Sequence, residues 1–451
     1  MAHKYEITRD YIQKLKDIIR AEDKNLALSQ MATLHPADLA EIFDFLSLEE
    51  VLFLFRLLDE EVAADVLVEI EEDDRERLLK ALPSEDIAQK YLDNMDSDDA
   101  ADVLADMSEQ RQEEVLSKMD DMDQAGDIVD LLNYSEDSAG GIMAKEYIVV
   151  KENWTVDECI KEIRRLVEEV EEVFYVYVLN DDEVLQGILS LKTLLISPAN
   201  RKAINLCEKD IISVKTDMED EDVGKIMQKY DLVVLPVVDS LGRLVGRITI
   251  DDVVDVIRDE AEKDYQMISG ISEDVEPDDR LLVQTRARLP WLIIGLVGGI
   301  LGAKVIGFFK PELAQETAFV MFLPLIAAMA GNVGVQSSSI IVQGLASNSI
   351  HMSSIARRVF REMRISVVNG IILSVLMLVY NLLVGEGYLL TATVSLALFT
   401  VIIFASIFGT FVPLILNRYK VDPALATGPF ITTTNDIMGL LIYLALTNML
   451  L

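Results

Sequence analysis

Near its C-terminal end the sequence reads Ile431-Thr432-Thr433-Thr434-Asn435-Asp436-Ile437-Met438-Gly439, which places a carboxylate inside the last of five long apolar segments. A charge at bilayer depth normally faces a bundle interior, a water-filled pathway or a bound cation, because burial in hydrocarbon costs it several kcal/mol. Asp436 is the only acidic residue within the five segments. We therefore predict that Asp436 lines a cation pore. The alternative is a protonated or internally paired aspartate that only joins helices.

The five apolar segments predict a bundle of five transmembrane helices. Each is long enough to cross about 30 Å of hydrocarbon at the helical rise. Basic residues cluster before the first segment, between the second and third, and between the fourth and fifth, which puts these three regions in the cytoplasm and the C-terminus outside. The segments run from about 289 to 309, 318 to 346, 365 to 384, 391 to 416 and 425 to 451.

The second segment contains a polar, glycine-rich run, Ala330-Gly331-Asn332-Val333-Gly334-Val335-Gln336-Ser337-Ser338-Ser339. In the middle of a membrane helix such a run predicts an interruption whose backbone carbonyls are exposed. Exposed backbone at this depth is tolerated only where protein or water satisfies it. We interpret the run as pore lining.

The remainder of the chain is strongly acidic. The whole sequence has 77 acidic and 40 basic residues, and the part before Thr285 holds 71 and 30 of them, a balance of −41. Such a region repels nucleic acid, whereas divalent cations relieve its self-repulsion. The N-terminus lacks the apolar core of a signal peptide, and Cys159 and Cys207 lack metal-ligand spacing, so we expect this part in a reducing cytosol.

Residues from about 35 to 133 repeat with a period of about twelve, in which an apolar residue precedes a helix-start residue, as in Leu46-Ser47 and Leu58-Asp59. Apolar positions three and four apart between these marks predict short amphipathic helices stacked as an acidic α-solenoid. Most of its carboxylates are expected to be solvated. Asp98, Asp99 and Asp102 lie within one helix, however, and such a cluster can share a hydrated divalent ion.

After Tyr134, short β-branched runs alternate with helical patterns, and the same order occurs twice. The run from Val234 to Thr249 resembles the second half of a cystathionine-β-synthase (CBS) repeat, a family in which two repeats pair into one nucleotide- or ion-sensing module. A Thr followed three residues later by Asp contacts an adenine nucleotide in that family, and Thr249 and Asp252 match this spacing. The resemblance therefore implies ATP or a related nucleotide as a ligand. Simple capping of the helix by Asp252 is the alternative.

The helix after the second repeat carries a series of carboxylates, of which positions 251, 255 and 259 share one face. Like charges four residues apart destabilise an isolated helix, so either salt-screened exposure or bound Mg²⁺ must compensate. We expect divalent ions shared with the cluster at 98, 99 and 102, or with the pair Asp217 and Glu219. The series comprises Asp251, Asp252, Asp255, Asp259, Glu260 and Asp264.

Together these features resemble the MgtE family of magnesium channels and transporters over nearly the whole chain. Further points of resemblance are the stretch from 331 to 336, Asp422-Pro423-Ala424-Leu425, and Asn435-Asp436 followed by Gly439-Leu440-Leu441-Ile442-Tyr443. The resemblance implies a homodimer with the pore on its two-fold axis and Asp436 holding hydrated Mg²⁺. Asn332 and Thr432 match positions near that pore, and the cytosolic carboxylates act as a magnesium sensor, with Asp422 near the cytoplasmic end of the fifth helix.

We thus expect a multidomain chain: an acidic helical N-domain at 1–133, an α/β module of paired CBS repeats at 134–200 and 201–260, a connecting helix and linker at 261–284, and a five-helix membrane domain at 285–451. The predicted function is a Mg²⁺ channel of the bacterial inner membrane, closed by high cytosolic Mg²⁺. A membrane-anchored sensor without conduction and a Mn²⁺ or Co²⁺ transporter are the alternatives. An enzyme is not expected, because phosphate loops and nucleophile–base motifs are missing from the sequence.

Overall fold

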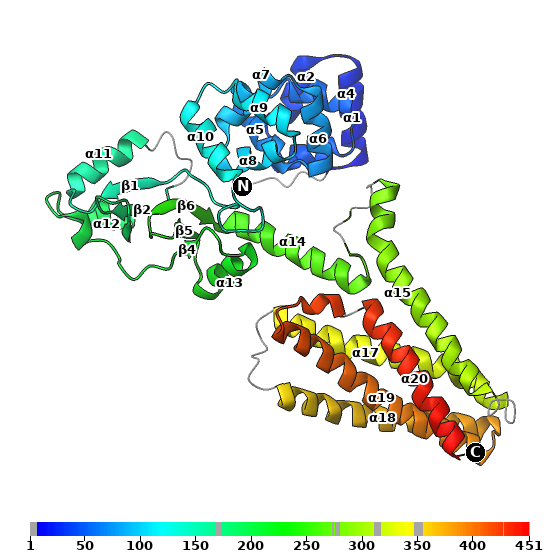
Figure 1. The fold of residues 1–451 in the computed structure, drawn as a ribbon. Coiled ribbons are helices and arrows are strands. Elements are labelled where there is room, and N and C mark those ends of the chain that lie inside the picture. Colours follow the sequence, from blue (N-terminus) through cyan, green and yellow to red (C-terminus); the bar gives the residue numbers. More distant parts are fainter. Residues whose placement is uncertain are drawn as a thin grey trace. The chain divides into compact units, whose positions relative to one another are not determined.

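The structure is a computed structural model that describes residues 7–166, 173–272, 275, 280–310, 317–346, 355–426 and 428–450. The chain divides into two compact units, Met1–Ile257 and Arg258–Leu451 (Figure 1). The first unit contains short helices and two small sheets, and the second contains long apolar helices. The predicted order of a helical domain, a module of two α/β repeats and apolar helices of membrane-spanning length is confirmed.

The N-domain is a stack of short helices, as the twelve-residue period predicts. Their starts follow from local capping. In α4, for example, the Ser47 hydroxyl accepts a hydrogen bond from Glu50 N, and the Glu50 carboxylate accepts one of 2.9 Å from Ser47 N. The helices are α1 (Arg9–Arg20), α2 (Lys24–Met31), α3 (Pro36–Phe43), α4 (Leu48–Phe55), α5 (Glu60–Glu69), α6 (Glu72–Ala81), α7 (Ser84–Asp86) with the turns Ile87–Tyr91 and Leu92–Asn94, α8 (Ser97–Ala105), α9 (Glu109–Leu116) and α10 (Met122–Leu131).

Each CBS repeat forms a three-stranded sheet in which the first two strands are parallel and the last two antiparallel. The first repeat has β1 (Ile148–Lys151), α11 (Val156–Leu166), β2 (Val176–Leu179), β3 (Leu185–Leu189) and α12 (Leu191–Ile196). The second has β4 (Val214–Lys215), α13 (Asp220–Tyr230), β5 (Val234–Val238), β6 (Leu244–Thr249) and the start of α14 (Ile250–Ser269).

The hydrophobic core of the first unit is divided unevenly. Buried residues of the second CBS repeat, such as Val214, Leu235 and Ile248, belong to one continuous cluster with the buried residues of the N-domain. The first repeat packs around a separate cluster that includes Ile148 and Val178. The N-domain and the second repeat thus share a core.

The described residues of the second unit contain five helices long and apolar enough to cross a membrane. Four of them, from α17 to α20, lie side by side (Figure 1). Their core surrounds Tyr443, whose hydroxyl donates a 2.9 Å hydrogen bond to the carbonyl of Phe319. The helices are α15 (Leu281–Phe308), α17 (Leu323–Ala346) preceded by the turn Thr317–Phe322, α18 (Ile355–Val384), α19 (Tyr388–Arg418), and α20 (Gly428–Leu450) preceded by the turn Pro423–Ala426.

The predicted interruption at the glycine-rich run is wrong, because α17 is a continuous helix from Leu323 to Ala346. Its glycines serve close packing instead. A Cβ at Gly409 of α19 would lie 2.3 Å from the carbonyl oxygen of Gly334, so the two backbones touch where both side chains are absent. The run therefore joins helices rather than opening one.

A second difference concerns α18, which begins at Ile355, about ten residues before the predicted apolar segment. Its first turns therefore carry Glu362 into the long helix. Within the five candidate spans Asp436 thus has an acidic companion that the apolar pattern alone did not include.

Candidate functional site

The protein has two candidate carboxylate sites, one on each compact unit. The membrane site is built from α17 and α20, which pack against each other where Gly331 faces Asp436. A Cβ at Gly331 would lie 2.8 Å from Asp436 Oδ1 and 3.0 Å from Thr432 Cγ2. Asp436 and Thr432 are one turn apart on α20, so glycine on the facing helix leaves room for both side chains.

The polar groups of this membrane site are only partly satisfied within one chain. Asp436 Oδ1 is buried and makes no hydrogen bond to the described residues. Thr432 donates its hydroxyl hydrogen to the carbonyl of Gly428 at 2.9 Å, which leaves the hydroxyl lone pairs available. Asn332 is exposed on the same chain. Carboxylate, hydroxyl and amide oxygens are the donors that Mg²⁺ prefers, usually with retained water.

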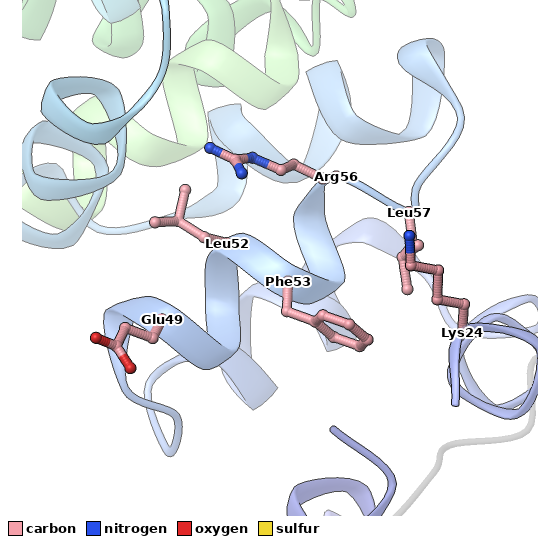
Figure 2. Close-up of a pocket in the computed structure, with 6 residues that line it drawn as sticks. All are labelled: Lys24, Glu49, Leu52, Phe53, Arg56 and Leu57. Carbon is pink, nitrogen blue, oxygen red and sulfur yellow. The ribbon is translucent and has the colours of Figure 1, made fainter. Parts of the chain in front are cut away.

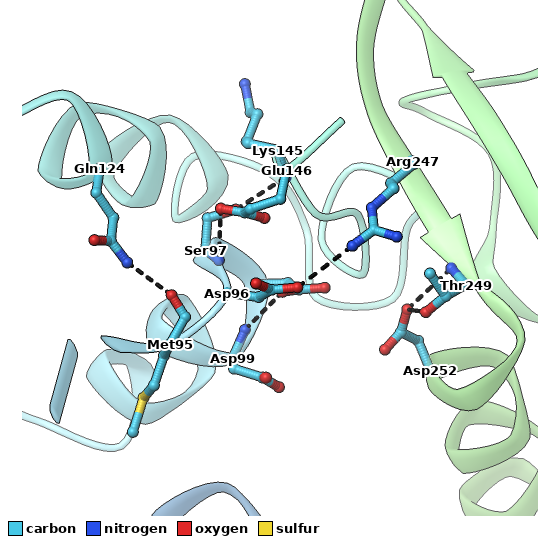
Figure 3. Close-up of polar contacts among 11 residues, drawn as sticks. Met95, Asp96, Ser97, Asp99, Gln124, Lys145, Glu146, Arg247, Thr249 and Asp252 are labelled. Atoms are coloured by element: carbon cyan, nitrogen blue, oxygen red, sulfur yellow. Dashed lines mark hydrogen bonds and ion pairs between the residues drawn. The ribbon is translucent and has the colours of Figure 1, made fainter. Parts of the chain in front are cut away.

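The soluble site is a carboxylate cluster where α8 of the N-domain meets the second CBS repeat. Carboxylate oxygens of Asp96, Asp98 and Glu146 all lie within 4.8 Å of one another. Ser97 holds Glu146 through two hydrogen bonds, 3.1 Å from its backbone nitrogen and 3.0 Å from its hydroxyl (Figure 3). This donor set fits a hard divalent cation.

Of the predicted trio on α8, Asp98 belongs to this cluster, and all three aspartates feel the charge of Asp252 at the start of α14. Burial and the charge of Asp252 raise the pKa of Asp99 to about 7. Burial, opposed by Arg75, raises the pKa of Asp102 to about 6. Burial and the charge of Asp99 also raise the pKa of Asp98. A cation bound nearby would stabilise the ionised form of these buried carboxylates.

Few positive charges offset this cluster. Buried Arg247 of β6 lies 3.4 Å from the carboxylate of Asp96 (Figure 3). Arg75 pairs with Asp106 at 2.5 Å, at the other end of α8. The charges that act most strongly on Asp98 and Asp99 are all negative, so a divalent cation would supply the missing positive charge.

The structure brings only part of the predicted α14 series to this cluster. In addition to burial, the negative charge of Asp251 raises the pKa values of Asp96 and Asp99, and that of Asp252 raises the pKa of Asp99. Asp259, Glu260 and Asp264 belong to the second compact unit, where Asp259 lies 3.7 Å from Arg258 and Glu260 lies 3.0 Å from Lys263. The exposed side chain of Asp255 lies on the first unit.

The remaining predicted sensor residues lie at helix starts. Asp217 and Glu219 are exposed immediately before α13, where Glu219 is the N-cap residue. Asp422 accepts a 2.8 Å hydrogen bond from the backbone nitrogen of Ala424 and so caps the turn before α20. Local capping accounts for the position of Asp422 without a bound ion.

The predicted nucleotide residues contact each other. The Thr249 hydroxyl donates a 2.5 Å hydrogen bond to Asp252, and the Thr249 backbone nitrogen donates another of 3.1 Å (Figure 3). Burial, opposed by these hydrogen bonds, raises the pKa of Asp252 to about 6. Asp252 thus caps α14 while it faces Asp99.

Three functional candidates escaped prediction from the sequence. Asp96 stands next to the predicted trio, and its position before a helix start is a usable signal. Glu146 lies about fifty residues further along, so only the fold brings it to Ser97. Glu362 was missed because the apolar pattern begins after it.

A surface pocket of about 400 Å³ in the N-domain contains none of the predicted site residues (Figure 2). Phe53, Leu52 and Leu57 supply its apolar wall, and Lys24, Arg56 and Glu49 supply charged groups at its edge. The carboxylate sites lie elsewhere.

Comparison with known proteins agrees with this arrangement. The family model described as MgtE divalent cation transporter matches residues 323–446, the MgtE intracellular N domain matches 34–137, and CBS domains match 139–199 and 203–259. A magnesium transporter MgtE of Thermus thermophilus is 31% identical over 445 residues, which cover 97% of this chain and 98% of that protein. This chain belongs to the MgtE family.

Other MgtE proteins show the same relationship. The magnesium transporter MgtE of Bacillus subtilis is 36% identical over 313 residues, 69% of each chain. The solved cytosolic domain of the Mg²⁺ channel MgtE in complex with ATP is 31% identical, with a TM-score of 0.51, and the match covers 54% of this chain and 99% of that one. The resemblance seen in the sequence is confirmed.

Proposed function

We propose that this protein conducts Mg²⁺ across the membrane, with Asp436 as the carboxylate that holds the hydrated ion in the pore. The observation that carries the proposal is the contact of Asp436 and Thr432 with Gly331 on the facing helix. Asn332, exposed on the next position of α17, would supply a further oxygen toward the ion path. A single carboxylate surrounded by neutral oxygens suits an ion that binds weakly enough to leave.

The test is Mg²⁺ flux into sealed proteoliposomes. Asp436→Ala should reduce the flux by about tenfold or more, because the pore loses its only charged ligand from α20. Glu386→Ala is the matched control, since that carboxylate lies in the connection between α18 and α19. Unchanged flux in Asp436→Ala would contradict the pore assignment and favour a membrane-anchored sensor. Parallel assays with Mn²⁺, Co²⁺ and Ca²⁺ define the selectivity.

The same proposal includes closure of the pore by cytosolic Mg²⁺. Mg²⁺ bound among Asp98, Asp99, Asp102, Asp251 and Asp252 would hold the N-domain against the second CBS repeat, whereas repulsion separates them when Mg²⁺ is scarce. Asp217, Glu219, Asp255, Asp259, Glu260, Asp264 and Asp422 would contribute further weak sites. A ligand can shift the equilibrium in this way only if it binds the closed state more tightly.

A contact within the second unit supports transmission from α14 to the pore helix. A Cβ at Gly428, the first residue of α20, would lie 2.3 Å from the carbonyl oxygen of Ile268 near the end of α14, and Gly428 has a φ of +41°. Pro429 packs against Gly270 in the same way. Displacement of the end of α14 would therefore act directly on the helix that carries Asp436.

We further propose a homodimer in the bacterial inner membrane, with cytoplasmic N-terminal domains and the C-terminus outside. The arginine and lysine clusters support this orientation, and protease treatment of a C-terminal tag in intact spheroplasts tests it. ATP binding near Thr249 and Asp252 is a further proposal, supported by the ATP complex of the related cytosolic domain. Calorimetry with ATP on the parent protein and on Thr249→Ala tests it.

A further inference from the structure

Glu362 joins three membrane helices through one carboxylate oxygen. Its Oε1 accepts hydrogen bonds from Ser337 of α17 at 2.8 Å and from Ser406 of α19 at 3.0 Å. The two serine hydroxyls also lie 3.0 Å apart. Ser337 is 4% exposed and Ser406 is 1% exposed, so this polar contact lies inside the helix bundle of one chain.

On α17, the serine that contacts Glu362 lies close to the glycines that pack against α19 and α20. Gly334 and Gly409 form a close approach of α17 to α19, and Ser337 and Ser406 lie about one turn from it on their respective helices. Gly331, which faces Asp436 and Thr432, lies six residues before Ser337, or about 9 Å at the helical rise. One rigid helix therefore connects the Glu362 contact with the proposed ion site.

A carboxylate that accepts hydroxyl hydrogen bonds away from water holds them more strongly than a neutral acceptor does. Close packing of Gly334 on Gly409 fixes the distance between α17 and α19 but leaves rotation of α17 about its own axis less restricted. Rotation is limited by a directional polar contact away from the axis. Ser337 provides that contact, and it is anchored by Glu362 and Ser406 from the two other helices.

We propose that Glu362 is a positioning residue for conduction: through Ser337 it sets the rotation of α17 at which Gly331 faces Asp436 and Thr432. The inference rests on the proposed pore at Asp436. Glu362 itself does not touch the ion in this scheme. Loss of its hydrogen bonds changes how well Mg²⁺ fits the site, and loss of its charge alone does not.

The experiment compares four variants of the full-length protein in proteoliposomes, with Mg²⁺ flux measured over a range of Mg²⁺ concentrations. Glu362→Ala and the double variant Ser337→Ala/Ser406→Ala should each raise the half-saturating Mg²⁺ concentration by about fivefold or more. Glu362→Gln should restore most of the parental value, because its amide oxygen accepts both hydroxyl hydrogens. Ser366→Ala is the matched control: this serine is equally buried on α18, but within the described part of the chain its hydroxyl bonds only to carbonyls of its own helix.

Two results would overturn the inference. If Glu362→Gln is as impaired as Glu362→Ala, the charge acts on the ion and the residue is a second ion ligand. If both the alanine variant and the double serine variant match Ser366→Ala, the contact has no role in conduction. Should Glu362→Ala fail to fold, the double serine variant and Glu362→Gln decide the matter. Asp436→Ala, measured in parallel, shows separately whether the pore assignment itself holds.

Discussion

Single glycines decide how closely the membrane helices pack. A methyl group at Gly409 would lie 2.3 Å from a backbone oxygen of Gly334, which cannot rotate away. We expect Gly409→Ala to destabilise the membrane domain by about 1–3 kcal/mol, the usual cost of overpacking. At Gly299 no described atom lies within 4 Å of the same position, so Gly299→Ala is the control. Thermal unfolding in detergent should show a clearly lower midpoint for Gly409→Ala alone, and equal midpoints would argue against this tight contact.

At this scale the sequence predicted the chemistry of residues better than their contacts. Asp436 stood out because a charge in an apolar run has few acceptable environments. The partner of Asp436 across the helix interface did not stand out, because glycine in a membrane segment is compatible both with a helix break and with close packing. The same ambiguity made α17 look interrupted.

Helix α8 and the start of α14 form the element pair on which the gating proposal depends. Asp99→Asn combined with Asp251→Asn removes one charge from each element, so Mg²⁺ has less to neutralise and stabilises the closed state less. We expect conduction to remain and the Mg²⁺ concentration for half-closure to rise by about fivefold, at the lower end of ordinary allosteric couplings.

Asp157→Asn is the matched control for this pair, because Asp157 is an exposed aspartate on α11 that pairs with Lys161 at 2.6 Å and is not among the proposed sensor residues. Single-channel or flux recordings with varied cytosolic Mg²⁺ measure the half-closure concentration. If the double variant closes at the same concentration as Asp157→Asn, the α8–α14 carboxylates are only a solvated surface.

Helices and strands were largely predictable because each has a strong local signal. The twelve-residue period anticipated the N-domain helices, and β-branched runs anticipated the six strands, with bounds that differ by only a few residues in most cases. The start of α18 was not anticipated, because its first turns are rich in arginine and a hydropathy pattern detects only the apolar part of a helix. Glu146 contacts α8 only because the tertiary fold brings the two together, and no local sequence pattern indicates such a contact.

Across the whole molecule the raised carboxyl pKa values predict a pH-dependent stability. In the unfolded chain an aspartate loses its proton near pH 3.8, its ordinary pKa. In the folded protein Asp99 keeps its proton up to about pH 7, and Asp102 and Asp252 keep theirs up to about pH 6. The folded protein therefore binds more protons between about pH 4 and pH 7, so its free energy of unfolding falls as the pH rises through that window.

The groups that face these aspartates are Asp96, Asp106, Glu136, Glu146 and Asp251 among the acids and Arg75 and Arg247 among the bases. Mg²⁺ replaces the lost protons, so millimolar Mg²⁺ should raise the unfolding temperature of the cytosolic part by several degrees at pH 8 and much less at pH 5. Differential scanning calorimetry of the full-length protein measures both values. An equal Mg²⁺ effect at the two pH values would show that these carboxylates do not bind the ion.

Under the gating proposal, the core shared by the N-domain and the second CBS repeat gives channel closure a temperature dependence. Separation of the two domains exposes part of the apolar surface of this shared core, which raises the heat capacity of the open state. Burial of such surface becomes a weaker driving force as water cools. A bacterium moved to the cold would therefore need more internal Mg²⁺ to shut the same pore, and its resting Mg²⁺ content would settle at a higher level. Recordings of half-closure at two temperatures would reveal this shift.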